Sequence, residues 1–394
     1  MNDIAPGAAK APSAAPYTLW ELVRYMLGLG TWGFGGPAAL LGYMYRDLVE
    51  KRGWISESDY KEGMTLAQLM PGPLAAQLAI YLGYVRYRLL GATLVGLAFV
   101  TPSFLMVVVL GAVYVAYGGL GWMQAVFYGV GAAVIGIIAI SAYKLTAKNV
   151  GSDKLLWAIF LGSAAVTVIT QSEIVWVFLG AGVLVWLWRA PPKFGGAMHG
   201  IAAPVAGWFA LGAVDWHQLG QIGAYFAYAG SFVFGSGLAI VPFLYGGVVK
   251  EFGWLTDRQF VDAVAVAMIT PGPVVITTGF IGYLVAGFWG AVVAALGTFV
   301  PCYLLTILPA PYFKKHGKRP AIAAFVDGVT AAAIGAITGA VIVIGQRSIT
   351  DWVTAALALV TAGVLWRFKK VPEPAIVLVA ALIGLVVHPL MTRP

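Results

Sequence analysis

Long apolar segments, separated by short polar loops, follow one another along almost the whole chain. Each segment is close to the roughly 20 residues that an α-helix needs to cross the hydrocarbon layer of a bilayer. The pattern predicts six such segments in each half, and hence an all-α polytopic membrane protein. The segments cover about 19–46, 58–85, 89–116, 121–146, 154–171 and 173–189, and then about 218–248, 258–284, 287–312, 321–346, 350–366 and 374–391.

The composition agrees with a chain that lies mostly in lipid. Apolar residues make up 60% of the 394 positions, charged residues only 10%, and the mean hydropathy is +0.87. The net charge of +8 lies in short loops, which indicates membrane orientation rather than binding to nucleic acid. Because there is one cysteine, Cys302, and the four histidines are scattered, the sequence predicts no disulfide, no metal centre and no cofactor.

The chain contains an internal repeat with an offset of 200 positions. The matching residues are Phe34, Gly35, Ala39, Tyr45, Val49, Gly53, Trp54, Ala67 and Pro71-Gly72-Pro73, which recur from Phe234 to Pro271-Gly272-Pro273. After that point the offset falls to 199, as in Pro102 and Pro301. We therefore divide the chain into a disordered tail at 1–16, repeats at 17–190 and 217–394, and a linker at 191–216.

Basic loops predict that the two repeats have opposite orientations. Lys and Arg follow segments two and four in the first repeat, but segments three and five in the second. An inversion after six crossings requires one more, which the apolar stretch 195–214 could provide. The result is a 6+1+6 inverted repeat with the N-terminus cytoplasmic and the C-terminus periplasmic, although segments one and two could also re-enter without crossing. The basic residues are Arg86, Arg88, Lys144, Lys148 and Lys154, and then Lys314, Lys315, Lys318, Arg319, Arg367, Lys369 and Lys370.

Proline and glycine interrupt the first two segments of each repeat. The motifs Pro71-Gly72-Pro73 and Pro271-Gly272-Pro273 remove amide donors and permit a turn, so each predicts a broken helix that binds substrate. A second break is predicted at Gly35-Gly36-Pro37 and at its counterpart Gly235-Ser236-Gly237. In transporters with inverted repeats, broken helices point amides at a substrate near the pseudo-two-fold axis. Four such breaks favour an oxyanion site, whereas the alternative is a set of structural kinks.

Polar residues near the breaks are candidate substrate contacts. Facing a wet cavity they would donate hydrogen bonds to substrate oxygens, whereas their ordinary role is to join packed helices. Gln77 and Thr277 share one repeat position, four residues beyond the second proline. The candidates are Gln68, Gln77, Thr270, Thr277 and Thr278.

Three charged residues are candidates for coupling. Arg24 is predicted to lie within the first segment, and its alternatives are snorkelling to the interface or pairing with Glu21. Glu62 and Asp262 are an acidic pair preserved by the repeat, each nine residues before its Pro-Gly-Pro. Either could carry a proton, or could be a solvated interfacial acid.

A basic run follows the first segment at positions 46–61. It contains Arg46, Lys51, Arg52 and Lys61, interleaved with acids. If segment one crosses completely, this run lies outside the cell. We interpret it as a solvated loop rather than as an anion site.

These motifs together resemble the chromate ion transporter family in its long, duplicated form, over essentially the whole chain. The resemblance rests on Phe34 to Pro37, on Gly53-Trp54, on the stretch from 71 to 84 and on the second Pro-Gly-Pro. It implies efflux of chromate across the inner membrane, driven by the membrane potential or a proton gradient, which gives chromate resistance. It also implies sulfate as a competitor. Gly237, which replaces the proline of the first repeat, departs from equal half-sites.

Two other functions remain open at this point. One is import or exchange of sulfate or a related oxyanion, since physical reasoning does not separate two tetrahedral dianions. The other is a membrane enzyme that acts on lipid phosphates, but the apolar segments contain no cluster of acid, base and metal ligands typical of such a site. No GxxxxGK[ST] motif is present, so an ATP-driven pump is not expected, and the chain is not predicted to be an enzyme. The sequence is compatible with a homo-oligomer.

Overall fold

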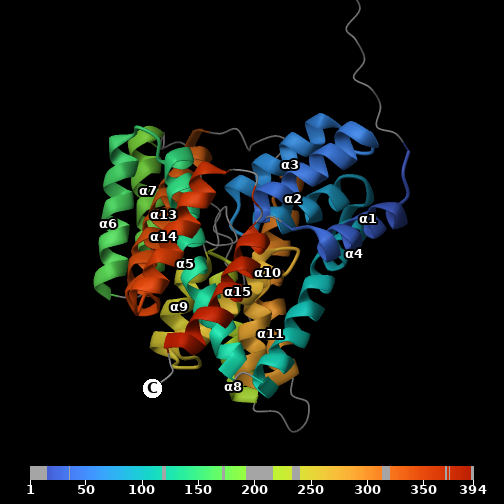
Figure 1. The fold of residues 1–394 in the computed structure, drawn as a ribbon. Helices are drawn as coiled ribbons and strands as arrows, with labels where there is room; N and C mark the ends of the chain where they lie inside the picture. The colour runs from blue at the N-terminus through green and yellow to red at the C-terminus, as the bar shows by residue number, and fades with distance from the viewer. Residues whose placement is uncertain are drawn as a thin grey trace, which may run out of the picture.

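The chain folds into a bundle of α-helices in which the two repeats interlock (Figure 1). The structure is a computed structural model. The residues that it describes are 16–34, 36–117, 121–170, 174–191, 216–232, 240–312, 320–368, 371 and 373–391, and they contain no β-strand. The predicted tail and most of the linker, with its expected crossing at 195–214, lie outside the described residues.

The helices follow the predicted segments, with the expected interruptions. The first repeat contains α1 (Leu19–Trp32), α2 (Gly36–Met44), the π-helical turn η1 (Tyr45–Lys51), α3 (Glu57–Leu69), α4 (Leu74–Tyr117), α5 (Gly121–Asn149), α6 (Lys154–Thr170) and α7 (Val175–Arg189). The second contains α8 (Trp216–Gly230), α9 (Ile240–Tyr245), η3 (Gly246–Glu251), α10 (Asp257–Ile269), the 3₁₀ turn η4 (Val274–Ile276), α11 (Thr277–Ile307), α13 (Pro320–Ser348), α14 (Trp352–Arg367) and α15 (Glu373–Met391). Both Pro-Gly-Pro breaks are present, because α3 and α10 end just before them.

Among the residues that the structure describes, five stretches of helix are long and apolar enough to cross a membrane. They are Leu74–Tyr117, Gly121–Ala147, Val274–Tyr312, Pro320–Gln346 and Glu373–Met391. By contrast, α1 and α3 have 14 and 13 residues, which at 1.5 Å per residue give only about 20 Å of helix. Neither is long enough for a hydrocarbon layer of about 30 Å.

Within the long helix α4, the chain turns back on itself. Arg88 has φ 52° and ψ −139°, and a Cβ placed on Gly83 would collide with the carbonyl oxygen of Gly91. Eight residues of straight helix would separate these glycines by about 12 Å, so α4 is a tight hairpin of two helices. The second repeat repeats this turn at Gly287, where Gly282 and Gly290 make the same close approach.

Two contacts of Tyr17 bring the first segments back to the end where they start. The ring of Tyr17, just before α1, stacks on Trp54 between η1 and α3, with ring centroids 5.5 Å apart. The Tyr87 hydroxyl, at the turn of α4, donates to the Tyr17 carbonyl at 2.6 Å. The starts of α1 and α3 and the turn of α4 therefore lie together. This return favours re-entrant segments one and two in the first repeat over segments that cross completely, and the topology stays a prediction.

The repeats exchange their last two helices. Helices α6 and α7 pack on α13 of the second repeat, and α14 and α15 pack on α5 of the first, while α4 packs on α11 and α5 on α13. Small residues permit these approaches: a Cβ on Gly328 would meet the carbonyl of Ala181, and a Cβ on Gly129 that of Ala380. In Figure 1, α1, α2 and α3 lie at the upper end, and α8 and the C-terminus at the lower end. This arrangement agrees with the inverted topology, which stays a prediction.

Candidate functional site

Each Pro-Gly-Pro break opens a helix and leaves backbone amides for a ligand. Gly72 has φ +142° and Gly272 has φ +89°, backbone conformations that favour glycine. The first helical bond of α4 runs from the amide of Gln77 to the Pro73 carbonyl at 2.9 Å, so the amides of residues 74–76 have no acceptor within the helix. In the second repeat the 3₁₀ turn at 274–276 follows the break. Both breaks therefore present the positive end of a helix.

The prolines of the second break shape the backbone rather than line a cavity. Pro271 and Pro273 are buried, and neither lines either of the two cavities described below. The Pro273 carbonyl accepts from the Ile276 amide at 3.0 Å, which closes the 3₁₀ turn. The equivalent amide of the first repeat, that of Ala76, has no acceptor within its helix. That Pro271 and Pro273 belong to the substrate site therefore stays a prediction. The second break offers fewer free amides to a substrate than the first break, at Pro71 and Pro73.

Each break lies against the long helix of the other repeat. A Cβ on Gly72 would lie 3.1 Å from the sulfur of Cys302 on α11, and a Cβ on Gly272 would collide with the hydroxyl of Ser103 on α4. Cys302 and Ser103 are equivalent in the repeat, and both are fully buried. In addition, the amide of Gly272 donates to the Gly33 carbonyl at 3.1 Å, where α1 ends. The second Pro-Gly-Pro thus meets the first break of the first repeat.

Gln77 is the predicted contact with unused hydrogen-bonding capacity. Its side chain is fully buried, and its Nε2 donates to the Pro71 carbonyl at 2.8 Å. Its Oε1 has no hydrogen-bond partner in the structure. A buried amide of this kind usually finds a partner, so the group is poised to bind a ligand or water beside the break.

The threonines of the second repeat are satisfied locally. Thr277 donates to the Val274 carbonyl at 2.7 Å, and Thr278 donates to the Val275 carbonyl at 3.1 Å. Thr270 donates to the Ala267 carbonyl, also at 3.1 Å. Each would have to rotate before it could donate to a substrate. The two half-sites therefore differ in chemistry as well as in sequence.

The remaining predicted contacts are spread out. Gln68 is exposed in the last turn of α3, just before the break. Gly36 and Pro37 begin α2, as expected for a proline in the first helical turn. Gly35 and the counterpart stretch 235–237, with Ser236, lie outside the described residues.

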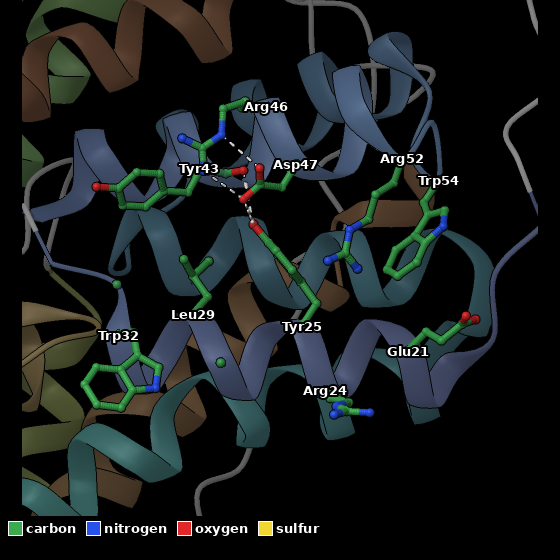
Figure 2. A pocket seen from close by; sticks show the side chains of 12 residues that line it. Glu21, Arg24, Tyr25, Leu29, Trp32, Tyr43, Arg46, Asp47, Arg52 and Trp54 are labelled. Atoms are coloured by element: carbon green, nitrogen blue, oxygen red, sulfur yellow. Dashed lines mark hydrogen bonds and ion pairs between the residues drawn. The ribbon is translucent and has the colours of Figure 1, made fainter.

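A cavity of about 650 Å³ lies between α1, α2 and η1 (Figure 2). We call it the arginine cavity, because Arg24, Arg46 and Arg52 line it. Gly33, which bonds to the second Pro-Gly-Pro, is also in its wall. The full lining is Glu21, Arg24, Tyr25, Gly28, Leu29, Trp32, Gly33, Tyr43, Arg46, Asp47, Arg52 and Trp54.

Ion pairs neutralise only part of this charge. Asp47 pairs with Arg46 at 2.8 Å and with Lys51 at 3.4 Å, and the hydrogen bond from Arg46 lowers the pKa of the Asp47 carboxyl, which keeps the pair ionised at neutral pH. Arg52 instead stacks on Trp54 and Tyr25, at 4.5 and 5.1 Å from the ring centroids (Figure 2).

Arg24 is exposed on α1 and makes no ion pair within the described part of the chain. The carboxylate of Glu21, which we considered as its partner, accepts from the Thr18 amide at 2.8 Å in a capping box. Arg24 and Arg52 are therefore two cations that face the cavity without a carboxylate partner.

Our interpretation of the basic run as a solvated loop stays a prediction for its two arginines, which are exposed. Arg46 and Arg52 line the arginine cavity, because α2 and η1 return the chain over α1. Lys61 fits the interpretation, since it is exposed and pairs with Glu57 at 2.6 Å. The sequence carried a signal for this difference, namely the arginines among aromatic residues at 43–54.

The equivalent region of the second repeat has no arginine. Ala224, Gly246 and Phe252 stand where the first repeat has Arg24, Arg46 and Arg52. The ring of Phe252 stacks on Trp254, with centroids 4.4 Å apart, and packs edge-on against Tyr225. Aromatic rings thus occupy the space that a guanidinium occupies in the first repeat.

Glu62 and Asp262 have different surroundings despite their shared repeat position. Glu62 is half-buried and accepts from the Tyr81 hydroxyl of its own repeat at 2.7 Å. Asp262 is only 3% exposed and accepts from Tyr114 of the other repeat at 2.7 Å. It also lines a second cavity, of about 280 Å³. The interfacial alternative therefore suits Glu62 better than Asp262.

Comparisons with known proteins agree over the full length. A family model described as chromate transporter matches the chain twice, at residues 20–186 and 220–385. A "Chromate transport protein" of Cupriavidus metallidurans is 70% identical over 98% of this chain and 97% of its own. A "Probable chromate transport protein" of Synechococcus elongatus is 62% identical over 94% and 96%, and a "Chromate transport protein" of Pseudomonas aeruginosa is 29% identical over 95% and 94%. No solved structure matches the chain.

Proposed function

This chain belongs to the chromate transporter family, and from that premise we propose that it is a secondary active transporter that exports chromate from the cytoplasm. In a cell such export would give chromate resistance. We propose no catalytic role, since the family is one of transporters.

One observation carries the proposed direction, namely that the arginines lining the arginine cavity in the first repeat are replaced by uncharged residues at the equivalent positions of the second. A cavity lined by cations concentrates anions at its mouth and raises the rate at which they arrive. Arg24 and Arg52 supply this charge, whereas Ala224 and Phe252 stand at the same repeat positions. An anion would therefore be collected from the side on which the first repeat opens.

The basic loops support a cytoplasmic position for that side. With segments one and two re-entrant, the basic run at 46–61 lies on the same side as the N-terminus and as Arg86 and Arg88. The positive-inside rule then puts all of them in the cytoplasm. Each repeat crosses four times in this scheme, and the linker stretch 195–214 still inverts the second repeat. We propose the inner membrane as the location, with the C-terminus in the periplasm.

From the cavity, the substrate would reach the broken helices. Gly33 joins the arginine cavity to the Pro-Gly-Pro at 271–273, because it lines the one and hydrogen-bonds the other. Beyond it, the free amides after each break would bind the oxygens of a tetrahedral dianion. From Gln77 only the second N–H of Nε2 would join them, because its unpartnered Oε1 accepts hydrogen bonds and would need a donor such as water. The buried residues Ser103 and Cys302 would face the same passage.

We propose Asp262 as the first candidate for carrying a coupling proton. It is buried, bonded to the opposite repeat and open to a cavity, so its protonation could alter how the repeats pack. Glu62 is the second candidate. The coupling would replace nucleotide hydrolysis, for which the chain has no motif.

Sulfate is the substrate that tests this proposal most sharply, because it has the same charge and shape as chromate. The experiment is uptake of radiolabelled chromate and sulfate into inside-out and right-side-out membrane vesicles, under imposed pH and voltage gradients. We expect chromate uptake into inside-out vesicles, with sulfate as a weaker competitor. Uptake confined to right-side-out vesicles, or a preference for sulfate, would support an importer or exchanger instead.

A further inference from the structure

An arginine joins three helices at one end of the bundle. Arg189, in the last turn of α7, donates to Asp153 at 2.5 Å and to Asp327 at 2.6 Å. Asp153 also accepts from the first amides of α6, and Asp327 lies on α13 of the second repeat. The hydrogen bonds from the Leu156 amide and Arg189 lower the pKa of the Asp153 carboxyl, so the Arg189–Asp153 pair of this arginine clasp stays ionised at neutral pH.

A histidine stands at the matching place at the other end. His388, in the last turn of α15, packs on the ring of Tyr128 on α5, with centroids 5.1 Å apart. The Tyr128 hydroxyl donates to Asp351 at 2.7 Å, and Asp351 caps the start of α14. All three side chains are half-buried.

The two clusters are equivalents in the repeat. His388 lies 199 positions after Arg189, and Asp327 lies 199 positions after Tyr128. Asp351 lies 198 positions after Asp153. Each cluster joins the start of one exchanged helix, the end of the next and a long helix of the opposite repeat. The arginine clasp therefore has a counterpart in which histidine replaces arginine and tyrosine replaces aspartate.

We propose that His388, Tyr128 and Asp351 form a proton-binding clasp, which closes when His388 is protonated and loosens when it is neutral. Arginine keeps its charge, whereas histidine side chains ordinarily change charge between about pH 5 and 8. His388 and Asp351 do not form an ion pair in the structure, but Tyr128 contacts both of them, so a protonated imidazole that turned toward Asp351 would form the counterpart of the Arg189–Asp153 pair. In the proposed inverted topology this clasp faces the periplasm, so external acid would hold that side of the bundle together. The proton-binding site itself does not depend on the transported anion.

Other charged groups surround this site and belong to its chemistry. Helix α10, which packs on α15, contributes Asp257, Arg258 and Asp262 to the 280 Å³ cavity that His388 also lines. From α5 the facing group is Tyr128. The cavity gives water a route to the imidazole, so protons can reach it from solvent.

The experiment is hydrogen–deuterium exchange of the purified protein in detergent, at about pH 5.5 and about pH 8, corrected for intrinsic rates. In the wild type we expect exchange at the end of α15 and the start of α14 to be about two- to fivefold slower at the lower pH, the effect of a partly exposed ion pair. H388R should give slow exchange at both pH values, and H388Q fast exchange at both. The arginine clasp is the internal control, because the ends of α6 and α7 should not respond to pH.

The result that overturns the proposal is a pH response in H388Q equal to that of the wild type. Loss of the response in D262N, with His388 intact, would overturn it too, because the titrating group would then be Asp262. If H388R does not fold, H388Q alone decides. Since exchange is measured without chromate, failure of the export proposal leaves this test unaffected.

Discussion

Arg52 in the first repeat and Phe252 in the second lie against equivalent tryptophans, Trp54 and Trp254. The scaffold around them is the same, since both repeats have a broken helix, a π-helical turn and a glycine turn before the tryptophan. One region is a cationic cavity and the other is filled by aromatic rings. The duplication thus preserved the backbone while the lining diverged. This asymmetric lining supports our proposal that an anion is collected from the side on which the first repeat opens.

The largest expected difference between the two regions is the side of the membrane from which each can be labelled. Lys51 and Glu251 are exposed and share one repeat position, so K51C and E251C form a matched pair. We expect an impermeant thiol reagent to label K51C only from the cytoplasm and E251C only from the periplasm. The native Cys302 is buried and needs no replacement.

Two results would contradict this scheme. The opposite pattern would mean that segments one and two cross completely, and labelling of both from one side would remove the inversion. The wild-type protein should remain unlabelled from either side, which controls for reaction at Cys302.

The next largest effect, on stability and on chromate flux, is expected from a substitution in the Pro-Gly-Pro break of the second repeat. G272A would strain the backbone by about 1 kcal/mol and drive a methyl group into the Ser103 hydroxyl, for about 1–3 kcal/mol more. We expect a lower thermal midpoint in detergent and chromate flux reduced about tenfold or more. G253A is the matched control, because Gly253 also has positive φ, at +60°, but open space around it.

A second-site change separates the clash from the strain. S103A in the G272A background removes the hydroxyl and should recover part of the flux. No recovery would show that the backbone strain at Gly272, rather than close contact between the repeats, is responsible. Wild-type flux in G272A itself would make the break an ordinary kink.

A smaller effect is expected in the arginine cavity. R24Q combined with R52Q should raise the KM for chromate about three- to tenfold at low salt, with less effect at high salt, because solvent screens exposed charges. K61Q is the control, since Lys61 is a cation on the same side that pairs with Glu57 outside the cavity. An equal rise of KM in K61Q would mean that the overall charge, not the cavity, attracts the anion.

The smallest effect is expected for the acidic pair. D262N should flatten the dependence of chromate flux on pH, because Asp262 is buried between the repeats. E62Q should change it less, since Glu62 is half-buried and bonded within its own repeat. Unchanged pH dependence in the double variant would exclude both as proton carriers.

Local sequence was sufficient for much of the fold. Apolar segment length predicted the helices, and the Pro-Gly-Pro motifs predicted where α3 and α10 end, because proline lacks an amide donor wherever it stands. The duplication followed from identities at a fixed offset, and the double match of the family model agrees with it. Gln77 was also identified from its place after the break.

Only the tertiary structure decided which distant residues meet. Nothing near Cys302 or Ser103 in the chain marks them, yet each faces the break of the other repeat because α4 packs on α11. Hydropathy did not distinguish a crossing helix from two short helices that return, since both need apolar residues; the contacts of Tyr17 with Trp54 and Tyr87 favour the return. The same return over α1 turned Arg46 and Arg52 from loop residues into the wall of a cavity. Local patterns specify where a helix forms and ends, whereas a site depends on long-range packing that brings separate segments together.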